Sequence, residues 1–327
     1  MVSTSFYVQL PSNTNVQGNR TCDFIVRLAR KLQFNADWSV GLAVIIYPHS
    51  WPSIGTNDAQ YLRIYWKTPE IFTNNEYYPD LVERLIPNIT QINVPKSKHS
   101  NSERLEEALN LLLSDQGKKL ASDLDKEIET VSTLRISTSI DPNDHSNLLY
   151  ERLIKHAKFR ANCLRSLNRK LIFEYNREYQ RFKVYYSNIQ DDENVNGNNC
   201  ISYVEVSQQL AYVIGLENLR LPLSGNYVSY APDLLGGISS LYVYAPGLIE
   251  PVLIGDTTAP LLRIVHVKKN QNDDNVEDIY AAIQYHKLLT KEISEIKIEI
   301  RTATGRLIPF EYGNCLLTLH FRKLPYF

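Results

Sequence analysis

The first 70 residues show the hydrophobic pattern of β-strands. In residues 23–28, apolar and polar side chains alternate for part of the segment, as expected for a strand with one buried face. The segment 38–47 is almost continuously apolar, which is typical of a strand covered on both faces, and it stops at Pro48, which lacks an amide donor. The pattern predicts strands at 5–10, 23–28, 38–47 and 61–67.

Between residues 78 and 171 the hydrophobic period changes to that of helices. Apolar residues recur three, four or eight positions apart, and charged residues fill the intervening positions. Gly117 interrupts this pattern, so it is compatible with one helix or with two. A further helix is expected from an N-cap at Asp144 or Ser146 to about Asn168. The apolar residues that define the first helical segment are Leu105, Leu109, Leu112, Leu120, Leu124, Ile128 and Val131.

The second helical segment is basic, whereas the first is net acidic. Packing of the two against each other, with their charges paired, is the simpler interpretation of this difference. A basic face for nucleic acid or for a partner protein is the alternative. The basic residues are Arg152, Lys155, Lys158, Arg160, Arg165, Arg169 and Lys170.

Strand patterns return after residue 170. Two short apolar runs flank a charged turn and predict a hairpin, and the polar stretch 190–199 predicts a loop. A short helix from about Val206 to Ile214 is expected to end at Gly215. The last predicted strand places Leu317, Leu319 and Phe321 on one face. The hairpin strands are expected at 171–175 and 182–186, and four more strands at 240–244, 261–267, 293–301 and 315–322.

Strands at both ends of the sequence therefore enclose a helical middle. A sheet whose first and last strands are far apart in sequence needs a non-local, Greek-key-like closure, and a jelly roll is its common form. The sequence predicts a mainly β protein, a single jelly-roll β-sandwich built from the N- and C-terminal segments with a helix-containing insertion. The expected division is 1–75 for the first part of the jelly roll, 76–170 for the insertion and 171–327 for the second part.

Composition narrows the classes of partner. The net charge of −1 predicts no long-range attraction to nucleic acid or to an anionic membrane. The 21 tyrosines favour an aromatic sheet core, and they also suit contacts between proteins. No stretch approaches the roughly 18 apolar residues of a membrane helix, and the N-terminus lacks the features of a signal peptide, so an intracellular protein is expected.

The sequence contains none of the common catalytic or metal-binding patterns. The seven histidines are isolated, without the His-x-His cluster that a metal-dependent jelly-roll enzyme usually has. Phosphate-binding glycine loops and Gly-x-Ser-x-Gly do not occur. Cys22, Cys163, Cys200 and Cys315 are far apart in sequence, which favours free structural thiols over a redox pair or a zinc site. A non-enzymatic protein without a cofactor is expected, and a jelly-roll enzyme is the less favoured alternative.

Several N-terminal motifs resemble the opening of a known protein family. Residues 5–12 read Ser-Phe-Tyr-Val-Gln-Leu-Pro-Ser and precede a strand rich in Arg and Leu. Trp-Ser-Val-Gly-Leu-Ala follows at 38–43 and Tyr-Pro-His-Ser-Trp at 47–51. This order resembles the minor capsid, or penton, proteins of Polinton/Maverick elements and of the related adintoviruses.

The C-terminal third is similar to the same family and carries more specific motifs. The collinear resemblance covers about 1–55 and 171–323, whereas the stretch from about 80 to 165 matches no part of the family. Phe173, Tyr175 and residues 210–216 resemble the family's central strand and short helix. The further motifs are Pro-Asp-Leu at 232–234, Ser-Leu-Tyr-Val-Tyr at 240–244, Ile-Glu-Pro at 249–251, Gly-Asp-Thr at 255–257, Ala-Pro-Leu-Leu-Arg-Ile-Val at 259–265, Ile-Pro-Phe-Glu at 308–311 and Leu-His-Phe-Arg-Lys at 319–323.

The resemblance implies a structural virion protein. It implies a penton subunit that forms homopentamers at the fivefold vertices of an icosahedral capsid, beside a separate double jelly-roll major capsid protein. It implies no cofactor, no specific nucleic-acid binding and no membrane span. A jelly-roll module that binds a glycan or a receptor is the alternative.

The resemblance also marks a set of family-signature residues, for which we expect structural roles. Pro48 and Trp51 fit a strand exit with an aromatic anchor, and Pro260 fits the turn before the strand 261–267. The complete set is Tyr47, Pro48, His49, Trp51, Tyr242, Glu250, Asp256, Pro260, Arg263, Phe310, Glu311 and Phe321.

Overall fold

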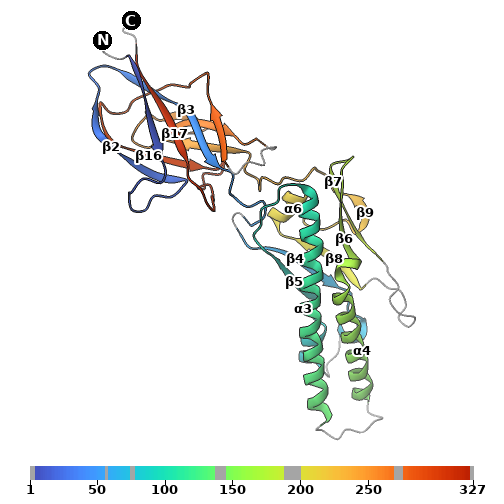
Figure 1. The fold of residues 1–327 in the computed structure, drawn as a ribbon. Coiled ribbons are helices and arrows are strands. Elements are labelled where there is room, and N and C mark those ends of the chain that lie inside the picture. Colours follow the sequence, from blue (N-terminus) through green and yellow to red (C-terminus); the bar gives the residue numbers. More distant parts are fainter. Residues whose placement is uncertain are drawn as a thin grey trace. The chain divides into compact units, whose positions relative to one another are not determined.

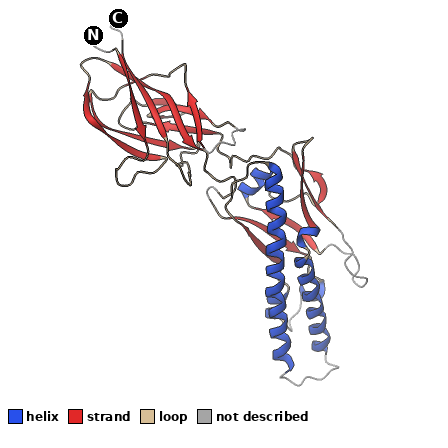
Figure 2. Cartoon of the chain, viewed as in Figure 1, coloured by secondary structure: helices blue, strands red, loops and turns tan. Residues whose placement is uncertain are grey.

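The computed structural model describes residues 4–55, 58–73, 78–136, 145–187, 200–268 and 275–324, and it is mainly β (Figure 1). The chain divides into two compact units. Unit 1 joins residues 1–52 to residues 238–327, and unit 2 comprises residues 53–237. The long helices belong to unit 2, as Figure 2 shows by colour.

Unit 1 is a sandwich of two antiparallel sheets. The first sheet has the strand order β1-β17-β3-β14, and the second has the order β2-β16-β10-β13. The first strand of the sandwich thus pairs with the last, and the second pairs with the next to last, which is the nested arrangement of a jelly roll. The predicted single jelly roll is confirmed. Its strands are β1 (Ser5–Pro11), β2 (Asp23–Gln33), β3 (Trp38–Pro48), β10 (Ser240–Tyr244), β13 (Leu261–His266), β14 (Asn275–Ile279), β16 (Glu292–Arg301) and β17 (Leu316–Lys323).

Three short strands complete unit 1. β11 (Val252–Ile254) and β12 (Thr257–Ala259) form a hairpin between β10 and β13, and β15 (His286–Lys287) pairs with β3. Successive side chains of a strand point to opposite faces of the sheet. The apolar side chains at every second position of the long strands therefore fill the space between the two sheets. The buried residues of β16 and β17 are Ile293, Ile296, Ile298, Ile300, Leu317, Leu319 and Phe321, and the last three are those predicted to share one face of β17.

The strand register shows where the chain leaves the sandwich. Ser5 pairs with Arg322, and Trp38 pairs with Lys323, so β1 and β3 begin at the same end of the first sheet at which β17 ends. β3 then runs to Pro48 at the opposite end, and residue 52 is the last of this segment in unit 1. The insertion therefore occupies a single connection, the one between the third and fourth strands of the jelly roll.

Unit 2 contains two antiparallel three-stranded sheets. One has the order β5-β4-β8 and the other the order β6-β7-β9. The strands are β4 (Gln60–Trp66), β5 (Ile89–Val94), β6 (Leu171–Asn176), β7 (Arg181–Tyr186), β8 (Ile201–Val206) and β9 (Ser224–Tyr227).

Most helices of unit 2 pack on these sheets around a common core, whereas a second buried cluster joins the two short helices 70–73 and 79–85 to the long helices. α6 ends at Gly215 in the left-handed conformation (φ 90°), as predicted from the sequence. Buried residues of α3, such as Leu109, share that core with Phe173 and Phe182 of the hairpin β6–β7. The helices are α1 (Glu70–Thr73), α2 (Pro79–Leu85), α3 (Ser102–Ile136), α4 (His145–Arg165), α5 (Leu167–Lys170) and α6 (Gln208–Ile214).

Gly117 lies inside α3, which is one continuous helix. The alternative of two helices is therefore wrong. A Cβ atom at Gly117 would lie inside van der Waals contact of the carbonyl oxygen of Leu164 and close to Leu167. The glycine thus allows α3 to approach the end of α4, and this packing outweighs the cost of about 1 kcal/mol for glycine in a helix.

The predicted charge pairing between the two long helices is present where Arg165 of α4 donates to Asp125 of α3. Arg152, Lys155 and Lys158 of α4 are exposed. Asp144, one of the two expected N-caps, and the predicted loop 190–199 lie outside the described residues.

The observed division differs from the expected one at both ends of the insertion. Residues 53–75 and 171–237, which we expected in the jelly roll, belong to unit 2. The reason is pairing: β4 pairs with β5 and β8, and the hairpin β6–β7 pairs with β9. The helix-containing insertion carries its own sheets and therefore extends from residue 53 to residue 237.

α4 places His156 between two aromatic rings, with ring centroids 5.9 Å from Phe72 and 6.1 Å from Phe159. Burial, and then the charge of Arg160, lower the pKa of His156 to about 4. An unfolded histidine has a pKa of about 6.5, so the folded state binds fewer protons as the pH falls through the range between these values. Unit 2 should therefore lose stability as the pH is lowered from 7 towards 4.

We expect His156→Gln to reduce this pH dependence. The thermal unfolding of unit 2 can be followed by circular dichroism at a helix wavelength, because the helices lie in unit 2. Some slope should remain, since burial also lowers the pKa of His99. An equal slope in wild type and variant would contradict the assignment to His156.

Candidate functional site

Aromatic side chains gather where β3 ends. The rings of Tyr47 and Trp51 are stacked with centroids 6.4 Å apart, and His49 lies 4.4 Å from Trp51. Phe310 meets Trp51 edge-on at 5.7 Å. Trp51 is buried, at 1% exposure. The structure thus brings together four of the signature residues, with Trp51 in contact with the other three.

The backbone just after β3 is held in place by residues near the C-terminus. The hydroxyl of Ser50 donates to the carbonyl oxygen of Tyr312 at 2.8 Å. Gly313 has a positive φ of 87° and lies against the Pro48 ring, where a Cβ would be 2.7 Å from the ring carbon. Glu311 is exposed beside this segment. Residues 47–51 and 310–313 therefore form one structural element, although some 260 residues separate them.

Arg263 closes the side of the sandwich between the edge strands β13 and β14. Its guanidinium lies over the ring of Tyr280, 3.5 Å from the centroid, and donates to the carbonyl oxygen of Ala282 at 3.1 Å. Nearby, Lys268 pairs with the buried carboxylate of Asp278 at 2.7 Å. Polar contacts thus cover this open side of the two sheets.

Tyr47 lies at the end of β3, near the carboxylate of Asp278. Its hydroxyl is buried and has no hydrogen-bond partner among the described residues. Burial, and then the carboxylate of Asp278, raise the pKa of Tyr47. A phenol in this position stays neutral at physiological pH, which is the state that a buried aromatic anchor requires.

The remaining signature residues are dispersed over unit 1. Glu250 pairs with Lys287 at 3.5 Å, and Asp256 is exposed in the turn between β11 and β12. The carbonyl oxygen of Pro260 accepts a hydrogen bond from the amide of Ala245 at 2.9 Å. Phe321 is buried between the sheets, stacked on Phe6 at 5.0 Å, whereas Tyr242 lies half-buried on β10.

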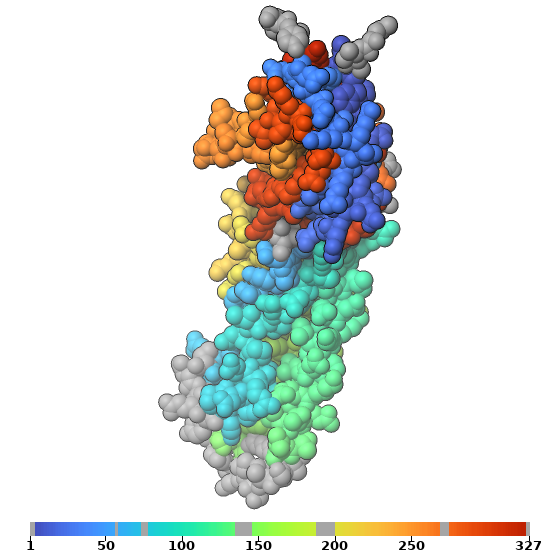
Figure 3. Space-filling view, turned by 90° about the vertical axis from the view of Figure 1, so that its left-hand side faces the viewer, coloured from blue at the N-terminus to red at the C-terminus, as the bar shows by residue number. Residues whose placement is uncertain are grey.

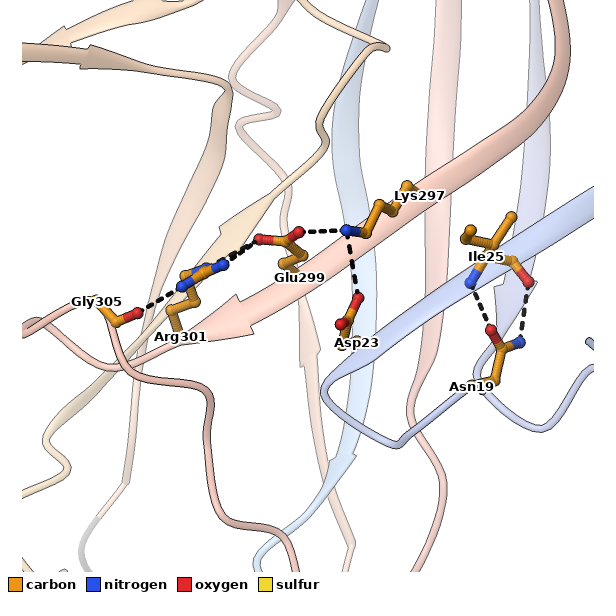
Figure 4. Close-up of polar contacts among 7 residues, drawn as sticks. All are labelled: Asn19, Asp23, Ile25, Lys297, Glu299, Arg301 and Gly305. Carbon is orange, nitrogen blue, oxygen red and sulfur yellow. Dashed lines mark hydrogen bonds and ion pairs between the residues drawn. The ribbon is translucent and has the colours of Figure 1, made fainter. Parts of the chain in front are cut away.

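The outer face of the second sheet carries a row of alternating charges on β16 (Figure 4). Lys297 pairs with Glu299 at 2.6 Å and with Asp23 at 3.7 Å. Glu299 accepts two hydrogen bonds from Arg301 at 2.7 and 2.9 Å, and Arg301 donates onward to the carbonyl oxygen of Gly305. Burial opposes the ionisation of Glu299, but hydrogen bonds from Lys297 and Arg301 outweigh it and lower the pKa of Glu299.

Tyrosines lie beside this charged row. Tyr242 pairs in register with Arg301, and Tyr244 pairs with Glu299. On the other side of Tyr242, Ile264 of β13 is exposed. Sequence reasoning missed the charged row, although its signal was present as the alternation of charged and isoleucine residues at 295–301. Asn19 lies in the loop before β2, and its side chain makes two hydrogen bonds with the backbone of Ile25 in β2, as Figure 4 also shows.

The outer face of the first sheet has a different composition. Tyr7 is 63% exposed and stacks on His320 with centroids 4.4 Å apart. The hydroxyl of Tyr285 lies 2.7 Å from Nδ1 of His320, and the guanidinium of Arg322 lies over the Tyr285 ring at 3.5 Å. In Figure 3 the N-terminal segments (blue) and C-terminal segments (red) share the surface of unit 1, in agreement with the pairing of β1 and β17.

The described ranges hold no group of three or more His, Cys, Asp or Glu residues that could bind a metal ion. Within these ranges, no helix combines the length and the apolar character that a membrane span needs.

The fold defines the class of this protein as a single jelly roll with one large insertion between its third and fourth strands. No protein-family model matches the chain, and no curated protein matches its sequence. Among solved structures, the chain is similar to the crystal structure of the mavirus penton protein, with 12% sequence identity and a TM-score of 0.46. The match covers 98% of this chain and 99% of that chain.

Proposed function

We propose that this protein is a structural capsid subunit, a penton of the kind encoded by Polinton/Maverick elements and adintoviruses. The main support for this proposal is the position in the fold of the motifs that resemble this family. Most of the motifs that resemble this family, at residues 5–51 and 240–323, fall in the two segments that fold together as the jelly roll, and the others, between residues 171 and 234, lie in the insertion. The segment without resemblance, about 80–165, lies inside the insertion.

In this role the protein works by assembling with copies of itself. A closed ring uses heterologous contacts, in which one surface of a subunit meets a different surface of the next. The outer faces of the two sheets are such a pair of unlike surfaces, one with Tyr7 and His320, the other with Tyr242 and the charged row. Tyr and Arg are enriched at protein interfaces because they combine buried area with hydrogen bonding.

The proposal includes a homopentamer at the fivefold vertex and a double jelly-roll major capsid protein as the neighbouring partner. It assigns the protein to the virion capsid and gives it no catalytic role and no cofactor. Tyr47, Trp51 and Arg263 then act in folding, since the first two lie in the aromatic cluster at the strand exit and the third closes the sandwich.

The solution mass tests this proposal. Light scattering coupled to size-exclusion chromatography, over a range of concentration and salt, should show a species near five times 37.7 kDa at high concentration. Co-expression with the major capsid protein of the same element is the second arm, because vertex rings can be held together by their neighbours. A monomer in both arms would overturn the proposal.

A matched pair of tyrosine variants locates the contact. Tyr7 and Tyr179 are equally exposed, at 63% and 62%, but lie in unit 1 and unit 2. We expect Tyr7→Ala to raise the dissociation constant of the assembly at least about tenfold, the loss typical of a central aromatic contact. Tyr179→Ala should leave it unchanged. Equal effects of the two changes would contradict the placement of the contact on the first sheet.

One observation favours a second candidate, a glycan- or receptor-binding module. Tyr179 and Tyr227 form an exposed aromatic pair in unit 2, with centroids 5.0 Å apart, and Asn176 donates to the Tyr227 hydroxyl at 3.3 Å. Exposed aromatic rings with polar edges are suited to binding. This candidate predicts a monomer and a glycan-array signal that Tyr179→Ala abolishes and Tyr7→Ala retains.

A further inference from the structure

Two cysteines that are distant in sequence meet in the core of unit 2. Cys163 lies in α4 and Cys200 directly precedes β8, and their sulfur atoms are 3.0 Å apart. Both are free thiols. Cys163 is 1% exposed, whereas Cys200 is half-buried. Cys200 therefore keeps part of its surface exposed, whereas Cys163 is enclosed in the core.

The backbone on both sides of this pair is fixed. Cys163 belongs to a helix whose neighbouring residues, Ala161 and Leu164, are buried in the core. The carbonyl oxygen of Cys200 accepts a hydrogen bond from the amide of Lys67 at 2.9 Å. An S–S bond is about 2.05 Å long, so the two sulfurs need to approach by only about 1 Å more to form a disulfide.

The surroundings of the pair are positively charged. Nζ of Lys170 lies 3.7 Å from the sulfur of Cys163, and the hydroxyl of Tyr186 lies 3.4 Å from the sulfur of Cys200. Arg160 is buried at 2% exposure. Its Nη1 donates to the carbonyl oxygen of Pro87, and its Nη2 has no hydrogen-bond partner among the described residues. A thiolate at Cys200 supplies a negative charge near these cations.

The two thiols are unequal in acidity. The hydrogen bond between the two sulfurs lowers the pKa of Cys200 against the opposing effect of burial, and Tyr186 and Lys170 also lower it. The same hydrogen bond and burial raise the pKa of Cys163. The sulfur of Cys200 is thus the nucleophile, and Cys163 keeps its proton until the second step.

We infer that Cys163 and Cys200 form an oxidisable pair that closes to a disulfide when the protein meets a low-molecular-weight disulfide such as oxidised glutathione. The thiolate of Cys200 attacks one sulfur of oxidised glutathione, whose S–S bond breaks and releases one glutathione thiolate. Cys163 then loses its proton to solvent and attacks the Cys200 sulfur, and the second glutathione leaves as a thiolate. One oxidised glutathione becomes two reduced glutathiones, and the pair loses two protons and two electrons.

The bond would tie α4 to β8 and close the chain segment between them, which contains the hairpin β6–β7. Such a loop closure should raise the thermal midpoint of unit 2 by about 10 °C, because it restricts the unfolded chain. The pair would stay reduced inside cells and oxidise outside them. The inference does not depend on the proposed capsid role, and neither result of its test bears on that role.

The test uses the full-length reduced protein treated with an excess of oxidised glutathione. We expect the loss of two of the four free thiols, a decrease of about 2 Da in intact mass, and a peptide map that links Cys163 to Cys200. The midpoint of helix unfolding should rise and return after reduction. Four remaining thiols, or a link that involves Cys22 or Cys315, would overturn the inference.

Two serine variants test the order of the steps. Cys163→Ser should trap a mixed disulfide of glutathione on Cys200, because the resolving thiol is missing. Cys200→Ser should leave Cys163 unmodified, since the remaining thiol is buried and protonated. Cys315→Ser is the control, as it lies in unit 1 and should leave the Cys163–Cys200 bond intact. Mixed disulfide on Cys163 in the Cys200→Ser variant, and none on Cys200 in the other, would overturn the assigned order.

Discussion

Trp51→Ala is expected to lower the free energy of unfolding of unit 1 by about 3–5 kcal/mol, the range for removing a large buried aromatic side chain. Trp51 is 1% exposed and contacts the rings of Tyr47, His49 and Phe310. Its loss leaves a cavity at the point where the N- and C-terminal segments are joined. Urea unfolding followed by tryptophan fluorescence measures this change, with Trp38 remaining as a reporter in unit 1.

Two further variants make the result specific. Leu253→Ala removes a side chain that is 83% exposed and should change the free energy of unfolding by no more than about 0.5 kcal/mol. Trp51→Phe keeps an aromatic ring in the site and should cost less than Trp51→Ala. If Trp51→Ala were as mild as Leu253→Ala, the ring would not anchor the strand exit.

Gly117→Val is expected to lower the free energy of unfolding of unit 2 by about 3 kcal/mol, because added atoms in a packed contact force the elements apart. Helix propensity alone predicts a small gain, since valine is a better helix former than glycine. The close carbonyl oxygen of Leu164 reverses the sign, as a side chain at residue 117 has no room. Circular dichroism during urea unfolding measures the change.

Lys118→Val is the matched control for this prediction. It places the same β-branched residue at the next position of α3, where the native side chain is exposed. Propensity should then cost only a few tenths of a kcal/mol. A stabilised Gly117→Val variant would show that α3 and α4 do not depend on the close approach at this glycine.

Elements with a strong local signal were predictable from the sequence. The alternation in β17 identifies its buried face, and the apolar run of β3 ends at Pro48 as expected. The helix α6 ends at Gly215, because a left-handed residue is favoured there and glycine adopts it without strain. These features depend on interactions within a few residues of the chain.

Pairing between strands was not predictable in the same way. The pattern at 61–67 and in the hairpin 171–186 indicates strands, but alternation does not say which strand lies alongside. Both segments pair within unit 2, so the boundary of the insertion moved from residues 76 and 170 to residues 53 and 237. One alternative from the sequence was that the helix is interrupted at Gly117. That alternative is wrong for a related reason, because the glycine is explained by its contact with the distant residue Leu164.

In the candidate site, too, some features were predictable from the sequence and others needed the tertiary structure. The signature residues were found from motifs, and the structure joins Tyr47, His49, Trp51 and Phe310 while it leaves Glu250 and Asp256 elsewhere on the surface of unit 1. The charged row on β16 was present as an alternation, but its position on an outer face needed the sheet. The pair Cys163–Cys200 was not predictable, because the two cysteines are far apart along the chain.

The sequence by itself determined the mainly β class, the jelly roll with its helix-containing insertion, and the positions of seven of the eight long jelly-roll strands and of α3, α4 and α6, because hydrophobic periodicity and turn residues act over short distances. Only the tertiary structure decided the pairing of β4 and of the hairpin β6–β7, the continuity of α3 through Gly117, and the meeting of Cys163 with Cys200. Each of these depends on contacts between residues far apart in sequence. Such contacts form only when the chain has closed its loops around a common core, and no local pattern encodes which distant residues will meet.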